Sequence, residues 1–210
     1  MIYEFPNPED PIRQGDIFQS VPRIDLNLSR LPVPSGKEII EDDWLKASSA
    51  NSPVIALVAM RSVWAIVITQ DCDAVRADDI VLCEIGHFEA IELLATNAKH
   101  PKGTMSLITK HARLNLKWFY LPPDPAVGFE DKMAVDFHSV LRVSRTYLEQ
   151  NLVRLRLARL NQIATEHFRE RLSEYYRRYP YDEWYPLDKA EFEEYRRSKP
   201  EPVEPFPWQR

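Results

Sequence analysis

The feature that most constrains the fold is an apolar stretch from Pro53 to Thr69, interrupted by Arg61 and Ser62. Both parts are rich in Val and Ile, which favour strands over helices. The stretch is too short and too broken to cross a bilayer. It therefore predicts two buried strands, residues 54–60 and 63–69, that pair with each other.

Further short apolar runs predict more strands, at residues 17–28, 80–85, 105–109, 116–121 and 133–143. Residues 153–160 alternate apolar side chains with arginines, which favours a half-exposed strand over the start of a helix. Helical spacing is found at residues 39–47, 88–98, 146–151 and 162–179. In the last helix the residues predicted to point inward are Ile163, Phe168, Leu172, Tyr175 and Tyr176.

Length and composition predict a single domain over residues 1–179. The 210 residues are 44% hydrophobic and 28% charged, as in an average globular protein that buries a core without disulfides. Residues 29–52, with turn signals at Pro32, Pro34 and Gly36, are predicted to be an insertion. Residues 180–210 are rich in Pro, aromatics and Glu and are predicted to form an extended tail.

The two cysteines, Cys72 and Cys83, are predicted to be free thiols, because no secretory leader precedes them. We therefore expect a cytoplasmic protein with no membrane contact and no cofactor.

Three segments together resemble the MazF/PemK-like toxin barrel family. They are Gly15-Asp16-Ile17, the strand Ala65 to Gln70, and the strand Ile80 to Cys83, in the order that the family has. Residues 134–140 and the closing helix are similar to that family's last strand and C-terminal helix. The resemblance covers about half the chain and implies a mainly β (α+β) fold, a small SH3-like barrel with a long C-terminal helix. The segment from Thr69 to Asp73 is also similar to segments of uncharacterised bacterial proteins.

The resemblance implies a metal-independent endoribonuclease, but the residues that would carry the activity differ. An Arg before the central strand and a Thr before the following strand would stabilise charge on the scissile phosphate. Here Val63 stands at the Arg position, and the Thr position falls near Asp78, whose carboxylate repels phosphate. Arg61 or Arg13 are the candidates for a displaced catalytic cation.

A second candidate site is Gln70-Asp71-Cys72-Asp73, at the end of a predicted strand. Cys72 can be a nucleophile with His87 or His138 as its base, in a hydrolase or a redox-sensitive protein. The neighbouring carboxylates of Asp71 and Asp73 oppose formation of the thiolate. The alternative is a small buried cysteine beside acidic turn residues.

Two metal sites are compatible with the residue types, although neither has a strong motif. Zinc can be held by Cys72, Cys83 and His87, with Asp73 or His100 as fourth ligand, but paired C-x-x-C motifs are missing. Mg²⁺ can be held by carboxylates if they converge from several loops, which more often are solvated turns. That set is Asp16, Asp71, Asp73, Asp78 and Asp79.

The last feature is a concentration of arginine between Arg142 and Arg178, with nine arginines against four acidic residues. Such a face can contact phosphates and stack on bases, or pair with an acidic protein surface. The residues predicted to make these contacts are Arg154, Arg156, Arg159, Arg169 and Tyr175.

From these observations the leading hypothesis is a non-catalytic binding or accessory module of a bacterial multi-component system, of the toxin–antitoxin or phage-defence type. Its Arg-rich face would contact a protein or, as the alternative, a nucleic acid, and a homodimer is left open. The second hypothesis is a MazF-like endoribonuclease with displaced catalytic residues. The third is a hydrolase or redox-sensitive protein in which Cys72 is the reactive residue.

Overall fold

The computed structural model describes residues 2–49, 52–89, 91, 117–177 and 197. The chain divides into two compact units, residues 1–176 and 177–210. The architecture below is that of the first unit. Four predicted features lie outside the described residues: the strand at residues 105–109, most of the helix at 88–98, His100, and the tail at 180–210 except Arg197.

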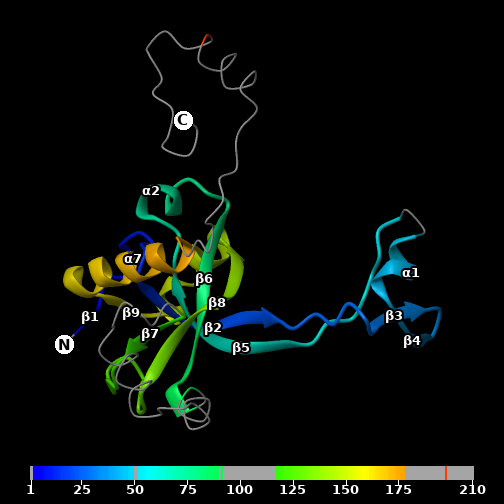
Figure 1. Cartoon of the computed structure of the whole chain (residues 1–210), viewed down its shortest axis with the longest axis horizontal. Coiled ribbons are helices and arrows are strands. Elements are labelled where there is room, and N and C mark those ends of the chain that lie inside the picture. Colours follow the sequence, from blue (N-terminus) through cyan, green and yellow to red (C-terminus); the bar gives the residue numbers. More distant parts are fainter. Residues whose placement is uncertain (1, 50–51, 90, 92–116, 178–196, 198–210) are drawn as a thin grey trace, which may run out of the picture. The chain divides into compact units, whose positions relative to one another are not determined.

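The main sheet of the first unit has seven antiparallel strands, so the mainly β prediction is confirmed (Figure 1). Its strand order is β1-β9-β2-β5-β6-β8-β7. The strands are β1 (Tyr3–Glu4), β2 (Asp16–Ile24), β5 (Met60–Val67), β6 (Asp79–His87), β7 (Trp118–Leu121), β8 (Met133–Ser144) and β9 (Arg156–Leu160). A short helix, α2 (Asp71–Ala74), connects β5 to β6.

One face of the sheet is covered by the helix α7 (Gln162–Tyr176). Phe168 of this helix is fully buried and packs against Phe119 and Phe137, with ring centroids 5.1 and 5.6 Å apart. The predicted C-terminal helix is therefore the element that closes this core.

The opposite face is covered by two short helices, α5 (Arg145–Gln150) and α6 (Leu152–Leu155). Successive residues of a strand point to opposite faces, and the neighbours Ile17 and Phe18 accordingly belong to two different core clusters. Apolar side chains therefore line both faces in the middle of the sheet, as the consecutive buried residues Ala65, Ile66 and Val67 of β5 show.

The two edges of the sheet approach each other through side chains. Tyr3 of β1 donates its hydroxyl to the carbonyl of Pro122, just after β7, at 2.8 Å, and its ring contacts Phe129. Within the described strands, however, β1 pairs only with β9 and β7 only with β8, so no backbone ladder closes the sheet. The sheet is therefore not a closed barrel in this part of the chain.

Residues 25–59, which we call the arm, follow the paired ends of β2 and β5 (Figure 1). The arm contains the hairpin of β3 (Leu31–Ser35) and β4 (Glu38–Asp42) and the helix α1 (Trp44–Ser48). Two backbone hydrogen bonds hold it together, from Trp44 to Leu28 and from Leu57 to Pro32.

The predicted hairpin of residues 54–60 and 63–69 is wrong. Arg61 and Ser62 lie inside β5, opposite Arg23 and Pro22 of β2, and residues 53–59 form no strand. A charged residue is tolerated at position 61 because Glu84 of β6 and Asp25 pair with its guanidinium. The first half of the apolar run thus belongs to the arm, and the second half belongs to the strand β5.

Three other predictions need correction. The helix predicted at 39–47 is the strand β4 followed by α1, which begins after Asp43 because that carboxylate caps the Lys46 N–H. The strand predicted at 153–160 is the end of the helix α6 followed by β9, which begins at Arg156. In α7, Ile163 and Tyr176 are 68% and 57% exposed, so they do not point inward.

Candidate functional site

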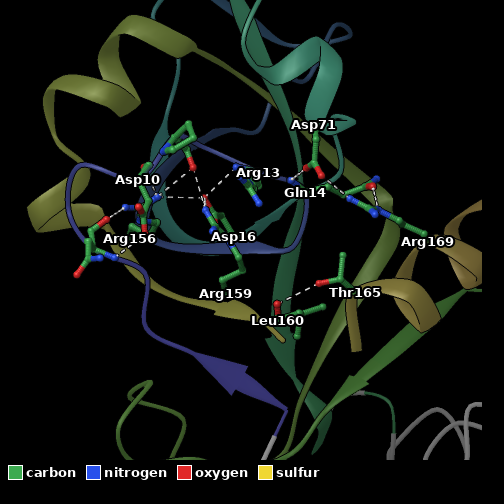
Figure 2. Close-up of polar contacts among 12 residues, drawn as sticks. Asp10, Arg13, Gln14, Asp16, Asp71, Arg156, Arg159, Leu160, Thr165 and Arg169 are labelled. Atoms are coloured by element: carbon green, nitrogen blue, oxygen red, sulfur yellow. Dashed lines mark hydrogen bonds and ion pairs between the residues drawn. The ribbon is translucent and has the colours of Figure 1, made fainter. Parts of the chain in front are cut away.

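A buried carboxylate organises the start of β2. Asp16 is fully buried, and its two oxygens accept hydrogen bonds from Nε and Nη2 of Arg159, the latter at 3.1 Å (Figure 2). Arg156 Nη1 and the Arg13 backbone N–H donate to the same carboxylate at 3.3 and 3.1 Å. Burial is the largest single effect and lowers the pKa of Arg159, but the hydrogen bond to Asp16 and the charges of Asp16, Glu4 and Asp10 together outweigh it and leave the pKa raised. The two arginines therefore face the interior as ions with a shared counter-charge.

The same arginines also hold the N-terminal segment on the sheet. Arg156 donates to the carbonyls of Asn7 and Asp10, and Arg159 donates to the carbonyl of Pro11 at 2.8 Å. Each guanidinium thus satisfies backbone oxygens that have no strand partner. Their positions in β9 are 146 to 149 residues from the carbonyls that they bind.

A second, more exposed layer connects α2, α7 and the same segment. Arg169 donates from Nε to Gln14 Oε1 at 2.7 Å and from Nη2 to Asp71 Oδ2 at 2.6 Å. Gln14 donates its backbone N–H to Asp71 Oδ1 and its side-chain amide to the carbonyl of Ile68. The side chains of Arg169 and Asp71 are 44% and 43% exposed, so this ion pair contributes little on its own.

Gly15 lies between the two layers, where the side chains of Thr165 and Leu160 leave little space for a Cβ. Its φ is +90°, its N–H donates to Val67 and its carbonyl accepts from Leu160. A Cβ here would lie 3.2 Å from Thr165 Oγ1 and 3.4 Å from Leu160 Cβ. Only glycine fits this position without displacing α7.

We expect Gly15→Ala to lower the free energy of unfolding by roughly 2–4 kcal/mol, from left-handed strain plus crowding. Urea unfolding measures the change. Gly128→Ala is the matched control, because Gly128 has φ +83° but no atom within 4 Å of the added Cβ. Equal losses in the two variants would show that the contact with Thr165 and Leu160 does not matter.

The two candidate ribonuclease cations are not brought together. Arg61 pairs with Asp25 and Glu84, in a cluster that also includes Arg23. Arg13 is exposed, and its side chain has no partner within the described residues. The two positions lie at opposite ends of β2, roughly 23 Å apart along the strand.

Cys72 lies at the surface on α2, and its Sγ is 3.9 Å from Gln70 Oε1. Neither predicted base is near it. His87 is at the far end of β6, roughly 26 Å along the strand from Asp79, and His138 lies about 20 Å along β8 from the same end. The structure therefore places neither of the two predicted histidine bases near the Cys72 thiol.

The predicted metal ligands also lie apart. Cys83 is buried in the sheet, and Cys72 and His87 lie toward the two ends of β6. Of the predicted Mg²⁺ set, Asp16 and Asp71 pair with different arginines, and Asp79 pairs with Arg142, while Asp73 and Asp78 have no cationic partner within the described residues. Among the described residues, no three His, Cys, Asp or Glu side chains form a group able to hold a metal ion.

Of the predicted contact residues, Arg156, Arg159 and Arg169 make the internal ion pairs described above. Tyr175 is partly buried against Phe137 and Tyr176. Arg154 is exposed, and its guanidinium has no partner in the described part of the chain.

No family model matches the chain, and no curated protein matches it. Its function must therefore be argued from its own residues. None of the described helices is long and apolar enough to cross a membrane.

The arm has a surface that the sequence analysis did not anticipate. Nine of the eighteen exposed large apolar side chains among the described residues lie in the arm, and two more, Ile24 and Met60, flank it. Leu45 is 81% exposed and Ile55 75%, and Leu31 is the single buried residue in the described part of the arm. The apolar run at residues 53–59 is the sequence feature that corresponds to part of this surface, but it was predicted to be a buried strand. The eleven side chains are Ile24, Leu26, Leu28, Ile39, Ile40, Trp44, Leu45, Ile55, Leu57, Val58 and Met60.

Proposed function

We propose that this protein is a non-catalytic binding module that docks a protein partner through its arm. The observation that carries the proposal is the combination of exposed apolar side chains with a single buried residue, Leu31, in the described arm. A two-stranded hairpin with so little core is marginally stable in water by itself. Exposed apolar clusters of this kind mark protein interaction sites.

The arm supports the proposal better than the Arg-rich face does. Three arginines of this face already donate hydrogen bonds to Asp16, Asp71 or backbone carbonyls, namely Arg156, Arg159 and Arg169. Fewer of their N–H groups are therefore available to bind a phosphate or an acidic protein. Nucleic-acid contact through this face stays a prediction. The setting in a bacterial toxin–antitoxin or phage-defence system is suggested by the family resemblance alone.

Photo-crosslinking tests the proposal in cells that express the full chain at its native level. A benzoylphenylalanine in place of Leu45 is expected to crosslink to one discrete protein. The matched control is the same residue in place of Val153, which is 79% exposed but lies on α6. Equal crosslinking at both positions, or none at either, would contradict docking through the arm.

The crosslinked protein is then purified and its affinity measured. Leu45→Ser combined with Ile55→Thr should weaken binding at least tenfold, because each apolar anchor contributes about 1.5–3 kcal/mol when buried. Both side chains are exposed in the free protein, so the variant should keep its stability. Val153→Thr should leave the affinity unchanged.

A different assay distinguishes the ribonuclease alternative from the non-catalytic binding module. Labelled single-stranded RNA is mixed with the protein across a salt series and run on a denaturing gel. Cleavage that Arg61→Ala or Arg13→Ala abolishes would contradict a non-catalytic module and support the MazF-like function. Binding that weakens steeply with salt, without cleavage, would instead support phosphate contacts.

A further inference from the structure

The β3–β4 hairpin has two edges of different chemistry. Gly36 and Lys37 form a two-residue turn between the paired residues Ser35 and Glu38, and Gly36 has φ +63°, as in a type II′ turn. In such a hairpin the pair next to the turn exchanges both hydrogen bonds, and the next pair along exchanges none. The N–H and C=O groups of every second residue therefore point away from the hairpin.

On β3 the outward positions are Pro32 and Pro34, which have no N–H. Both prolines lie at positions whose backbone groups point outward. This agrees with the hydrogen-bond pattern, because a proline at an inward position could not donate an N–H to the paired strand. The Pro32 carbonyl already accepts a hydrogen bond from Leu57 at 2.8 Å. This edge is therefore protected against a further strand.

On β4 the outward positions are Ile39 and Glu41, which keep both backbone groups. Neither backbone N–H has a hydrogen-bond partner within the described residues. Ile39 is 62% exposed and its neighbour Ile40 41%. β4 has no proline, bulge or lysine within its five residues. Its three charged residues, Glu38, Glu41 and Asp42, are all acidic, so they oppose an acidic strand but not a basic one.

We propose that β4 binds an extended segment of the partner protein as a third strand of the hairpin, with lysine or arginine alternating with apolar residues. This rests on the proposed function and specifies how the arm would hold its partner. Main-chain hydrogen bonds to Ile39 and Glu41 supply affinity, and side chains beside Ile40 supply specificity. A third strand also gives the hairpin the stability that two strands lack.

The charge of β4 selects the occupant. Residues 38–43 include four carboxylates and no cation, and Arg30 and Lys46 pair with only two of the four. A second copy of the chain is a poor occupant, because antiparallel pairing centred on Ile40 would place Glu38 opposite Asp42 of the other copy. Like charges directly opposite each other destabilise a strand pair, whereas a basic segment is attracted.

The probe is a fluorescein-labelled peptide of alternating valine and lysine, followed by anisotropy with the full chain. Glu41→Pro removes one outward N–H at a position equivalent to Pro32 and Pro34, so the hairpin register is kept. Glu41→Thr is the matched control, because it removes the same carboxylate and retains the N–H. We expect Glu41→Thr to bind within about threefold of the unaltered protein and Glu41→Pro to bind at least tenfold more weakly.

A second measurement leaves the protein unaltered. The peptide is N-methylated either at all its valines or at all its lysines, so that one parity of N–H groups is removed at a time. Strand addition predicts that one of the two peptides binds and the other does not. Equal binding of both peptides, or of both Glu41 variants, would overturn the inference.

A peptide of alternating valine and glutamate should not bind, and tight binding of it would overturn the proposed charge preference. Failure of the valine–lysine peptide to bind would reject the strand-addition mode. If Leu45 still crosslinks to a partner, the proposed function survives that result. If Leu45 gives no crosslink, both proposals fail.

Discussion

Replacing Asp16 with alanine is expected to lower the free energy of unfolding by about 3–5 kcal/mol. The carboxylate is fully buried and is the shared counter-ion of Arg156 and Arg159. Its removal leaves two guanidinium ions without a carboxylate partner and the Arg13 N–H without an acceptor. The loss is large because it measures uncompensated buried charge, which exceeds the net contribution of the intact ion pairs.

Urea unfolding at neutral pH measures this change, and Asp71→Ala is the matched control. Asp71 also pairs with an arginine and accepts a backbone N–H, but its side chain is 43% exposed and water can replace its partner. We expect Asp71→Ala to cost at most about 1–2 kcal/mol. A loss for Asp16→Ala no larger than for Asp71→Ala would mean that burial does not determine the strength of this network.

The result would also bear on Gly15-Asp16-Ile17, one of the three segments on which the family resemblance rests. In the structure Gly15 allows the close approach to α7 and Asp16 binds the β9 arginines, so both residues have structural roles. A motif that fixes how a sheet begins can occur without the activity of the family in which it is familiar. The motif therefore supports a prediction of β structure more strongly than a prediction of catalysis.

Local sequence predicted the strands that are apolar and flanked by turn residues. β6 and β8 are close to their predicted ranges, and so are α5 and α7, because periodicity and length are local properties. β5 was misplaced because a charged residue, Arg61, looked like a turn. Its actual partners, Asp25 and Glu84, lie 36 and 23 residues away in sequence.

The candidate site was harder to predict for the same reason. The ion pairs of Asp16 join residues about 140 positions apart, and no local pattern assigns a partner to an arginine. The alternating arginines of residues 153–160 therefore resembled a solvated or nucleic-acid-binding face. The arm was missed because an apolar segment predicts burial unless the rest of the fold leaves it uncovered.

The two cysteines are expected to differ in reactivity by at least about a thousandfold. Burial, with a smaller effect from the charge of Asp136, raises the pKa of Cys83 from 9.0 to about 12. At pH 8 this lowers the thiolate population of Cys83 by about three orders of magnitude, and the sheet also excludes the reagent. Cys72 is exposed, so its thiol meets the reagent without opening of the fold.

The same pKa change predicts the response to alkali. The folded-state pKa of Cys83 lies above its unfolded value, so the unfolded chain releases this proton first. The associated stability is fully present below pH 9 and is lost as the pH rises toward 12. Burial also raises the pKa of Tyr3, which acts in the same direction at higher pH.

Iodoacetamide at pH 8, followed by intact mass, measures the labelling. We expect one rapid label on the native protein, which Cys72→Ser removes, and a second label only in urea. We expect Cys72 to be alkylated at a rate close to that of glutathione, because His87 and His138 are distant from it. Such a rate would show that the thiol is not activated and would contradict the nucleophile hypothesis. A rate a hundredfold faster would show that a group near α2 activates Cys72, and the third functional hypothesis would then take precedence over a purely binding role.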